Sequence, residues 1–317
     1  MEERNNKMSS AKFFFNNITI LQLLLIFIQI FSSLELDLKS FEIFKPNHIT
    51  FIEGHRGVNR EFPENTLRAF QNALDNEIDG IELDVWLSKD NIPVVVHGSL
   101  FGFLYFYYKK AFGFVRNYLL DDLKKLEVLN GNDKMPTLEE VFLLSQGKLF
   151  INIEVKDGRC DKLFPILVDL IKKYDMFEKI SISSFHHKYA KYVSEFNKNN
   201  DKKIEFGFLY RKKLIFDLFK YDMKNATLNV YYKDATKERC DKAHENGMAL
   251  IAWFRMNDKE NDEIYKQLLD NGVDCIISNF PKQAKAYRDF YFSNYNKTNI
   301  SDEYNNYTYY LNNKDEL

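Results

Sequence analysis

The chain has 317 residues, with 44 Lys and Arg against 46 Asp and Glu and a formal net charge of −2. This near balance argues against a nucleic-acid partner, which would favour a clearly basic face. The three cysteines exclude a disulfide-dense scaffold and allow at most one internal bridge. The aromatic content of 16% is high, and the length is compatible with one large domain or two small ones.

The N-terminal segment, residues 1–33, has basic residues ahead of a largely apolar run from Phe13 to Phe31, followed by Ser32 and Ser33. This order is typical of a secretory signal peptide. The run is also close to the roughly 20 residues that span a bilayer, so an uncleaved membrane anchor is the alternative.

In the middle of the chain, short apolar runs rich in β-branched residues alternate with longer amphipathic segments. This alternation predicts a mainly parallel sheet with helices outside it. The strands are expected at 49–54, 80–86, 93–97, 149–156, 179–185, 204–210, 228–232, 248–254 and 274–279. The helices are expected at 66–76, 137–145, 162–174, 186–197, 237–245 and 260–270, with Asn65 as a candidate cap of the first.

A TIM (β/α)₈ barrel of about 250 residues fits the segment 45–290. The predicted strands exceed the eight of a barrel by one, and we expect Leu228–Tyr232 to be a short rim segment. The step from Asp84 to His97 is short for a parallel crossover, which predicts an incomplete outer ring of helices. An open doubly wound sheet is the alternative, although the sequence has no Gly-rich phosphate-binding motif to support it.

Residues 293–317 are rich in Asn and Tyr and lack apolar periodicity, which predicts a flexible tail. The tail ends in Lys-Asp-Glu-Leu at 314–317, a retention signal of the endoplasmic reticulum. Together with the N-terminal segment, it predicts a folded part in the lumen and a KDEL receptor as partner. We also expect glycosylation at one or more of the sequons that begin at Asn225, Asn296, Asn299 and Asn306.

Polar residues gather at the ends of the predicted strands. Glu82 and Asp84 are two residues apart, as are Glu154 and Lys156. Alternate residues of a strand share one face, so each pair is expected to point into the mouth of the barrel, where barrel active sites lie. Three carboxylates with one lysine predict an oxygen-ligand site for Mg²⁺ or Ca²⁺, because charges in apolar strands are costly unless they are paired or bound to metal.

His55 and His97 also end predicted strands. A single histidine is more often a structural hydrogen-bonding group, and a single Glu-X-Asp pair is more often a solvated edge. The convergence of these residues on successive strand ends favours an active site. His186, His187 and His244 fall on predicted helices, where we expect surface or capping roles.

Several blocks, in order from about Gly54 to Pro281, carry a resemblance to a known family, the glycerophosphodiester phosphodiesterases. They are His55-Arg56-Gly57, Pro63-Glu64-Asn65-Thr66, Ala69-Phe70, Glu82-Leu83-Asp84-Val85, Val96-His97, Pro136-Thr137-Leu138-Glu139-Glu140, Asn152-Ile153-Glu154-Val155-Lys156, Ser183-Ser184-Phe185, Trp253 with Asn257, and Ser278-Asn279-Phe280-Pro281.

The resemblance implies a TIM barrel that cleaves phosphodiesters with one divalent cation. It also implies a role for each matching residue. Glu82, Asp84 and Glu154 would bind the metal, His55 and His97 would be the general acid and base in an order left open, Arg56 and Lys156 would face the phosphate, and Trp253 would line the pocket.

The chain departs from the family pattern after the second histidine. Gly98 stands where the family usually has Asp, and residues 100–114 read LFGFLYFYYKKAFGF in place of an Arg-Thr-Thr-like segment. Asn279 stands where the family commonly has Asp. The aromatic insertion is interpreted either as an apolar rim that accepts an acyl chain or touches a membrane surface, or as a loop packed over the barrel.

The predicted function is therefore metal-dependent hydrolysis of glycerophosphodiesters or lysophospholipids in the lumen. A phospholipase D-like lyase that forms a cyclic phosphate is one alternative, because His97-Gly98 also resembles the related phospholipase D toxins. A catalytically silent lipid-binding protein is the other.

Overall fold

The computed structural model describes residues 49–98, 102–104, 107–109, 111–129, 131–210 and 226–298. The predicted signal or anchor segment, the KDEL end and the sequons at Asn225, Asn299 and Asn306 lie outside these ranges. Within them, no helix is both long enough and apolar enough to cross a membrane.

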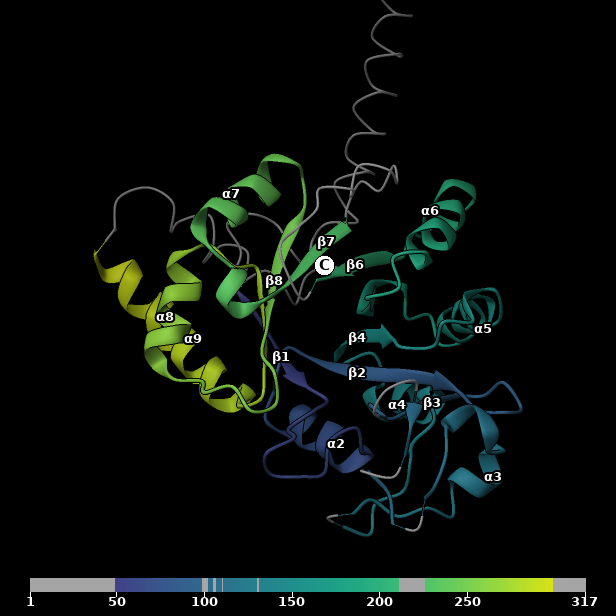
Figure 1. The fold of residues 1–317 in the computed structure, drawn as a ribbon. Helices are drawn as coiled ribbons and strands as arrows, with labels where there is room; N and C mark the ends of the chain where they lie inside the picture. Colours follow the sequence, from purple (N-terminus) through teal and green to yellow (C-terminus); the bar gives the residue numbers. More distant parts are fainter. Residues whose placement is uncertain are drawn as a thin grey trace, which may run out of the picture. The chain divides into compact units, whose positions relative to one another are not determined.

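Eight parallel strands close into a barrel surrounded by helices (Figure 1). The strands follow the order β1-β9-β8-β7-β6-β5-β4-β2, and pairing of β1 with β2 closes the ring. This architecture is a TIM barrel, and the doubly wound alternative is wrong. The barrel strands are β1 (Phe51–His55), β2 (Gly80–Leu87), β4 (Phe150–Val155), β5 (Ile180–Ser184), β6 (Glu205–Leu209), β7 (Ala226–Tyr231), β8 (Ala249–Trp253) and β9 (Cys275–Ser278).

All nine predicted strands are present, but the prediction of which one lies outside the barrel was wrong. The segment expected at the rim, Leu228–Tyr232, is largely strand β7, which pairs in parallel with both β6 and β8. The additional strand is β3 (Pro93–Val95), which runs antiparallel to β2. A tight turn at Asn91, where φ is 62°, reverses the chain, so the short step after Asp84 is a hairpin.

Helices lie outside the barrel in each crossover that the structure describes (Figure 1). The crossover from β2 to β4 contains α4, and the crossover from β6 to β7 lies outside the described residues. The predicted gap in the outer ring rested on the step from Asp84 to His97, but that step is a hairpin and the crossover that includes it contains α4. The helices are α2 (Leu67–Asp75), α3 (Leu120–Leu123), α4 (Leu138–Ser145), α5 (Cys160–Lys173), α6 (Tyr189–Asn199), α7 (Lys237–Glu245), α8 (Asp262–Asp270) and α9 (Pro281–Thr298), with short 3-10 turns at η2 (Val115–Asn117), η3 (Phe177–Lys179) and η5 (Tyr232–Asp234).

Two boundaries differ from the expectation. Thr66, not Asn65, caps α2, because its hydroxyl accepts a hydrogen bond from the amide of Ala69 at 3.2 Å. The last helix, α9, continues to Thr298 and thus into the segment expected to be a flexible tail. All three cysteines are buried and free, so no internal bridge forms.

The aromatic insertion after His97 has a small apolar core of its own. Leu104, Tyr108 and Ala111 are buried there together with Val115 from η2. The insertion is therefore packed, as one interpretation of the sequence required. One of its aromatic side chains, Phe112, is 77% exposed.

Candidate active site

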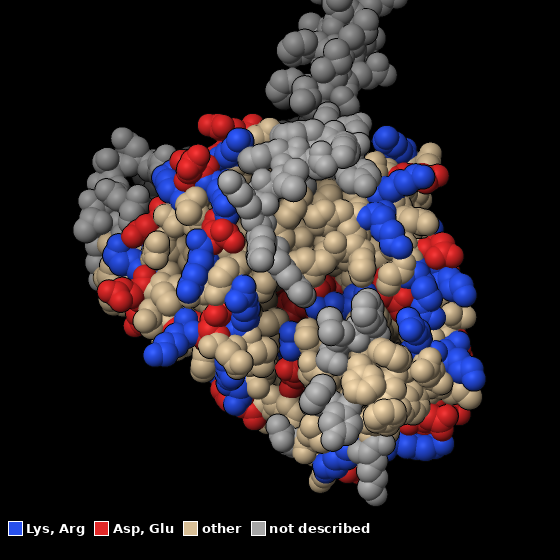
Figure 2. Space-filling model, in the orientation of Figure 1, with Lys and Arg blue, Asp and Glu red and all other residues tan. Residues whose placement is uncertain are grey.

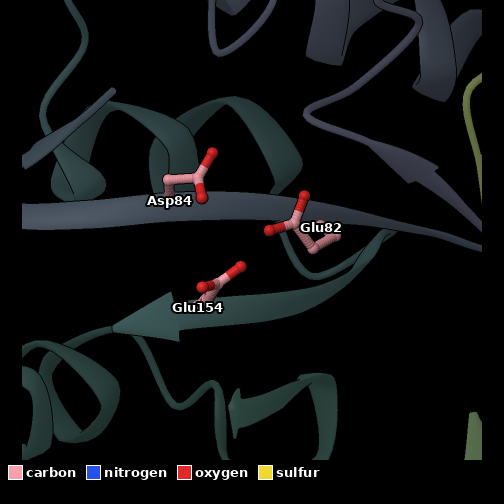
Figure 3. Close-up of side chains that lie close together, drawn as sticks. All are labelled: Glu82, Asp84 and Glu154. Atoms are coloured by element: carbon pink, nitrogen blue, oxygen red, sulfur yellow. The ribbon is translucent and has the colours of Figure 1, made fainter. Parts of the chain in front are cut away.

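Strand register brings the predicted acidic residues together. In the pairing of β2 with β4, Asp84 lies opposite Glu154, and in the pairing of β1 with β2, His55 lies opposite Glu82. The three carboxylate side chains point toward one another from β2 and β4 (Figure 3). One oxygen of each lies within 4.8 Å of the others.

This acidic cluster fits a divalent cation. All three carboxylates are buried, and Glu82 Oε1 has no hydrogen-bond partner among the described residues. The ammonium of Lys156 lies 3.0 Å from Asp84 and 2.7 Å from Glu154, so it balances part of the negative charge. An all-oxygen ligand set of this kind is the one that hard divalent cations prefer.

The electrostatics of the cluster differ between its members. Burial raises the pKa of Glu82 well above its usual value, and the neighbouring carboxylates of Asp84 and Glu154 raise it further. Burial opposes ionisation of Asp84 as well, but the cations of Lys156 and Arg56 outweigh it and lower the pKa of Asp84. A divalent cation at this point would favour the ionised form of all three groups.

His55 is held by an amide whose orientation is fixed. The Asn279 Nδ2 group donates to the Arg255 carbonyl at 2.9 Å and to the Glu260 carboxylate at 2.8 Å, and both partners are acceptors. Asn279 Oδ1 must therefore face His55 Nδ1, at 2.9 Å, and accept its hydrogen bond. The proton of the neutral ring is then on Nδ1, which leaves Nε2 with a free lone pair.

His97 is held by the chain that follows it. Its carbonyl accepts a hydrogen bond from Trp86 Nε1 at 3.0 Å, and its Nδ1 lies 2.7 Å from the hydroxyl of Tyr107. Burial lowers the pKa of His97 to about 3, although the Asp84 carboxylate opposes this shift. Burial, with the Arg56 cation adding to it, lowers the pKa of His55 to about 3, so both rings are neutral near pH 7.

The two predicted phosphate-facing cations lie beside the acidic cluster. The Nε atom of Arg56 is 3.1 Å from Asp84, and its NH1 atom is 2.8 Å from Glu64. Arg56 has a φ of 58°, and Gly57 follows at 81°. A Cβ at Gly57 would lie 2.9 Å from atoms of Ala69, so this sharp turn against α2 requires glycine.

One pocket connects these groups to an apolar wall. His55, Arg56, Glu82, His97, Glu154 and Lys156 line its polar side. Its other side includes Phe185, Leu209, Trp253, Phe254, Met256 and Ile277, with Arg255 beside them. Trp253 is among the lining residues. Charged side chains of both signs meet in the middle of the face in Figure 2, next to an uncharged surface.

Sequence reasoning missed the residues that support the site from outside the strand ends. Asn65 contacts Asp84 instead of capping α2. It belongs to the block Pro63-Glu64-Asn65-Thr66, but the predicted role of a helix cap was wrong. Glu260 contacts Asn279, 19 residues further along the chain. Tyr107, which contacts His97, lies in the insertion that does not match the family pattern. No spacing rule predicts either contact.

A model of the glycerophosphoryl diester phosphodiesterase family matches residues 55–283. A glycerophosphodiester phosphodiesterase of Caldanaerobacter subterraneus is 32% identical over 245 residues, which cover 74% of this chain and 95% of that protein. A solved structure from Galdieria sulphuraria, described as a candidate glycerophosphodiester phosphodiesterase, has 29% identity and a TM-score of 0.68, and covers 76% of this chain and 98% of that chain. A phosphodiesterase from Oleispira antarctica, solved with the product sn-glycerol-3-phosphate, shares the fold at 20% identity and a TM-score of 0.65, and covers 76% of this chain and 97% of that chain. The chain belongs to the glycerophosphoryl diester phosphodiesterase family and is a phosphoric diester hydrolase.

Proposed function

We propose that the protein hydrolyses glycerophosphodiesters and lysophospholipids, with His55 and His97 as the acid–base pair. The observation that carries this proposal is a pocket in which Glu82 and Glu154 of the acidic cluster and two histidines adjoin an apolar wall. The polar side suits a phosphodiester, and the apolar side suits the glycerol backbone or the first part of an acyl chain.

The role of His55 follows from the position of its ring proton, and His97 takes the complementary role. His55 Nε2, with its free lone pair, takes a proton from the attacking water or from a neighbouring hydroxyl of the substrate. His97 donates the proton of its neutral ring to the oxygen of the leaving alcohol, and the proton taken up by His55 returns through solvent to His97, so the net products are an alcohol and a phosphomonoester. Lys156 and Arg56 balance the charge that develops on the phosphate. A Mg²⁺ or Ca²⁺ ion bound by Glu82, Asp84 and Glu154 would supply Lewis-acid stabilisation of that charge.

The decisive experiment is turnover of glycerophosphocholine and of lysophosphatidylcholine, followed by phosphorus NMR with Mg²⁺ or Ca²⁺ and after chelation. We expect metal-dependent release of a phosphomonoester. The His55→Ala and Glu82→Gln variants should lose at least about a hundredfold in rate. The controls are His186→Ala and Glu127→Gln, which change exposed or half-exposed residues outside the pocket lining and should keep the rate.

Each other outcome identifies a specific alternative. Accumulation of a cyclic phosphate would favour the lyase. Turnover of glycerophosphocholine alone would remove lysophospholipids from the proposal. A folded, metal-loaded protein without turnover of either substrate would contradict the enzymatic role and favour lipid binding.

We further propose that the exposed face of the insertion touches the membrane from which a lysophospholipid is taken. Phe112 is 77% exposed, its ring contacts that of Phe103 at a centroid distance of 5.6 Å, and Arg116 lies over Phe114 at 5.1 Å. The same insertion contacts His97, a residue of the pocket lining, through Tyr107. Phe112→Ser should weaken sedimentation with anionic vesicles, whereas Phe290→Ser, a 60% exposed Phe on α9, should not.

We propose the lumen of the endoplasmic reticulum as the location, on the strength of the N-terminal segment and the KDEL end. Deletion of residues 314–317 should release the protein into the medium of expressing cells, since the KDEL receptor would no longer return it. Endoglycosidase sensitivity of the retained protein would report use of the sequons. A cytosolic full-length protein would refute this location without affecting the proposed chemistry.

A further inference from the structure

The second histidine has a hydrogen-bond partner that comes from the insertion. The Tyr107 hydroxyl lies 2.7 Å from His97 Nδ1, and the two rings meet edge to face at 5.7 Å. The backbone around Tyr107 is fixed, because its amide donates to the Leu104 carbonyl at 2.9 Å and its own carbonyl accepts from Leu129 at 3.0 Å. Leu104 belongs to the buried core of the insertion.

The residue directly after His97 cannot supply such a partner. Gly98 has a φ of 59°, and a Cβ at that position would lie 2.7 Å from the Cα atom of Gly102. The turn therefore excludes any side chain at position 98, including a carboxylate. The insertion folds back over this turn and brings a phenol to His97 instead.

The direction of the hydrogen bond decides where His97 carries its proton. A phenol can donate to imidazole or accept from it, and it is the better donor toward a neutral ring nitrogen. Burial raises the pKa of Tyr107, so its hydroxyl keeps its proton. A ring that accepts at Nδ1 holds its own proton at Nε2.

We propose that Tyr107 is the positioning residue of His97 and donates to Nδ1, which holds the proton of His97 on Nε2. The two histidines of the site then have opposite tautomers: His55 has a free Nε2 that can accept a proton, and His97 has an Nε2–H that can donate one. The catalytic role given to these tautomers rests on the proposed function, but the tautomers themselves can be measured without turnover.

The first test is nitrogen NMR of the metal-free protein labelled with ¹⁵N-histidine, near pH 7.5, with assignments from His55→Ala and His97→Ala. We expect a protonated Nδ1 for His55 and a protonated Nε2 for His97. In Tyr107→Phe, the His97 signals should move toward a mixture of tautomers. Tyr118→Phe is the matched control, because it removes a hydroxyl that bonds Phe112 in the same insertion. A protonated Nδ1 of His97 in the unaltered protein would overturn the proposal.

The second test is a double-mutant cycle on glycerophosphocholine hydrolysis. Tyr107→Phe should lower kcat by about tenfold to a hundredfold with KM nearly unchanged, because positioning is lost while binding is kept. In a His97→Ala background, Tyr107→Phe should cause no further loss. Additive losses in the two backgrounds would mean that Tyr107 acts on folding or on substrate binding, and would overturn the proposal. If the unaltered protein shows no turnover, the proposed function fails and the NMR result alone decides the tautomer.

Discussion

Asn65 holds the central carboxylate of the acidic cluster. Its Nδ2 donates to Asp84 Oδ2 at 2.8 Å, and its Oδ1 accepts from the Asp84 amide at 3.3 Å. The backbone at Asn65 has a φ of 56°, a conformation that asparagine tolerates better than most residues. Asn65 therefore fixes the orientation of Asp84 in the candidate metal site without being a member of the acidic cluster.

Asn65→Gly should weaken divalent-cation binding by about tenfold to a hundredfold, the usual effect of losing a group that orients a ligand. Glycine accepts the positive φ, so the loss reports the side-chain hydrogen bonds and not backbone strain. Titration calorimetry with Mg²⁺, Ca²⁺ and Mn²⁺ measures it. Asn91→Gly is the matched control, because Asn91 has a φ of 62° on an exposed turn. Equal affinity in the two variants would contradict the assigned role.

The residues at the strand ends could be predicted from the sequence, and those that support them could not. Glu82, Asp84 and Glu154 follow from alternation along a strand and from the alignment of parallel strands. The contact of Tyr107 with His97 depends on how the insertion folds around Leu104, and the contact of Asn279 with His55 joins the ends of β9 and β1, 224 residues apart in the sequence. Such contacts are set by tertiary packing, which local patterns do not encode.

At the scale of the elements, the sequence predicts the positions of the strands, but it does not show which of the nine lies outside the barrel. The apolar runs at Pro93–Val95 and Ala226–Tyr231 look alike in sequence, and both are strands. Their difference lies in direction: β3 follows a tight turn and returns along β2, whereas β7 follows a longer connection and runs parallel to β6. The short connection between β2 and β3 indicates an antiparallel hairpin. The sequence analysis interprets it instead as a parallel crossover without a helix.

The pairing of β6 with β7 contains a position that only glycine fits. Gly207 lies opposite Thr227, and a Cβ at Gly207 would lie 2.7 Å from Asn229 Nδ2 and 2.9 Å from Thr227 Oγ1. Both side chains are buried and bonded to each other at 2.8 Å. The polar pair thus occupies the space that any side chain at position 207 would need.

Gly207→Ala should lower the free energy of unfolding by about 1–3 kcal/mol, as overpacking of a buried site does. Urea denaturation followed by circular dichroism measures the change. Gly158→Ala is the control, because a Cβ at Gly158 would meet no atom within 4 Å. A barrel unchanged by Gly207→Ala would mean that Thr227 and Asn229 can move aside at little cost.

At the scale of the whole molecule, the barrel encloses a titratable carboxyl group as well as apolar side chains. Glu53 in β1 is fully buried. It accepts a hydrogen bond from Asn152 Nδ2 at 3.0 Å, and the Cys275 thiol also donates to its carboxyl group. Burial raises the pKa of Glu53 to about 8, against an ordinary value of 4.5. The folded protein therefore keeps a proton on Glu53 that the unfolded chain has lost at neutral pH.

This difference sets the sign of a pH dependence. Below pH 4.5 both states hold the proton, and between 4.5 and about 8 only the folded state does. Unfolding then releases a proton, so the contribution of Glu53 to stability is lost progressively as pH rises, by about 1.4 kcal/mol for each pH unit. Above the folded-state pKa the barrel holds an uncompensated buried charge.

Glu53→Gln keeps the shape of the side chain and removes its titration. The difference in unfolding free energy between this variant and the unaltered protein should therefore grow in favour of the variant from pH 5 to pH 8. Urea denaturation at pH 5, 6, 7 and 8 measures this trend, and the trend is independent of any fixed cost of the new amide. Glu245→Gln, at an exposed position on α7, is the control and should show no such trend. A difference that stays constant with pH would mean that Glu53 is ionised in the folded barrel, with a counter-charge or water reaching its buried oxygen.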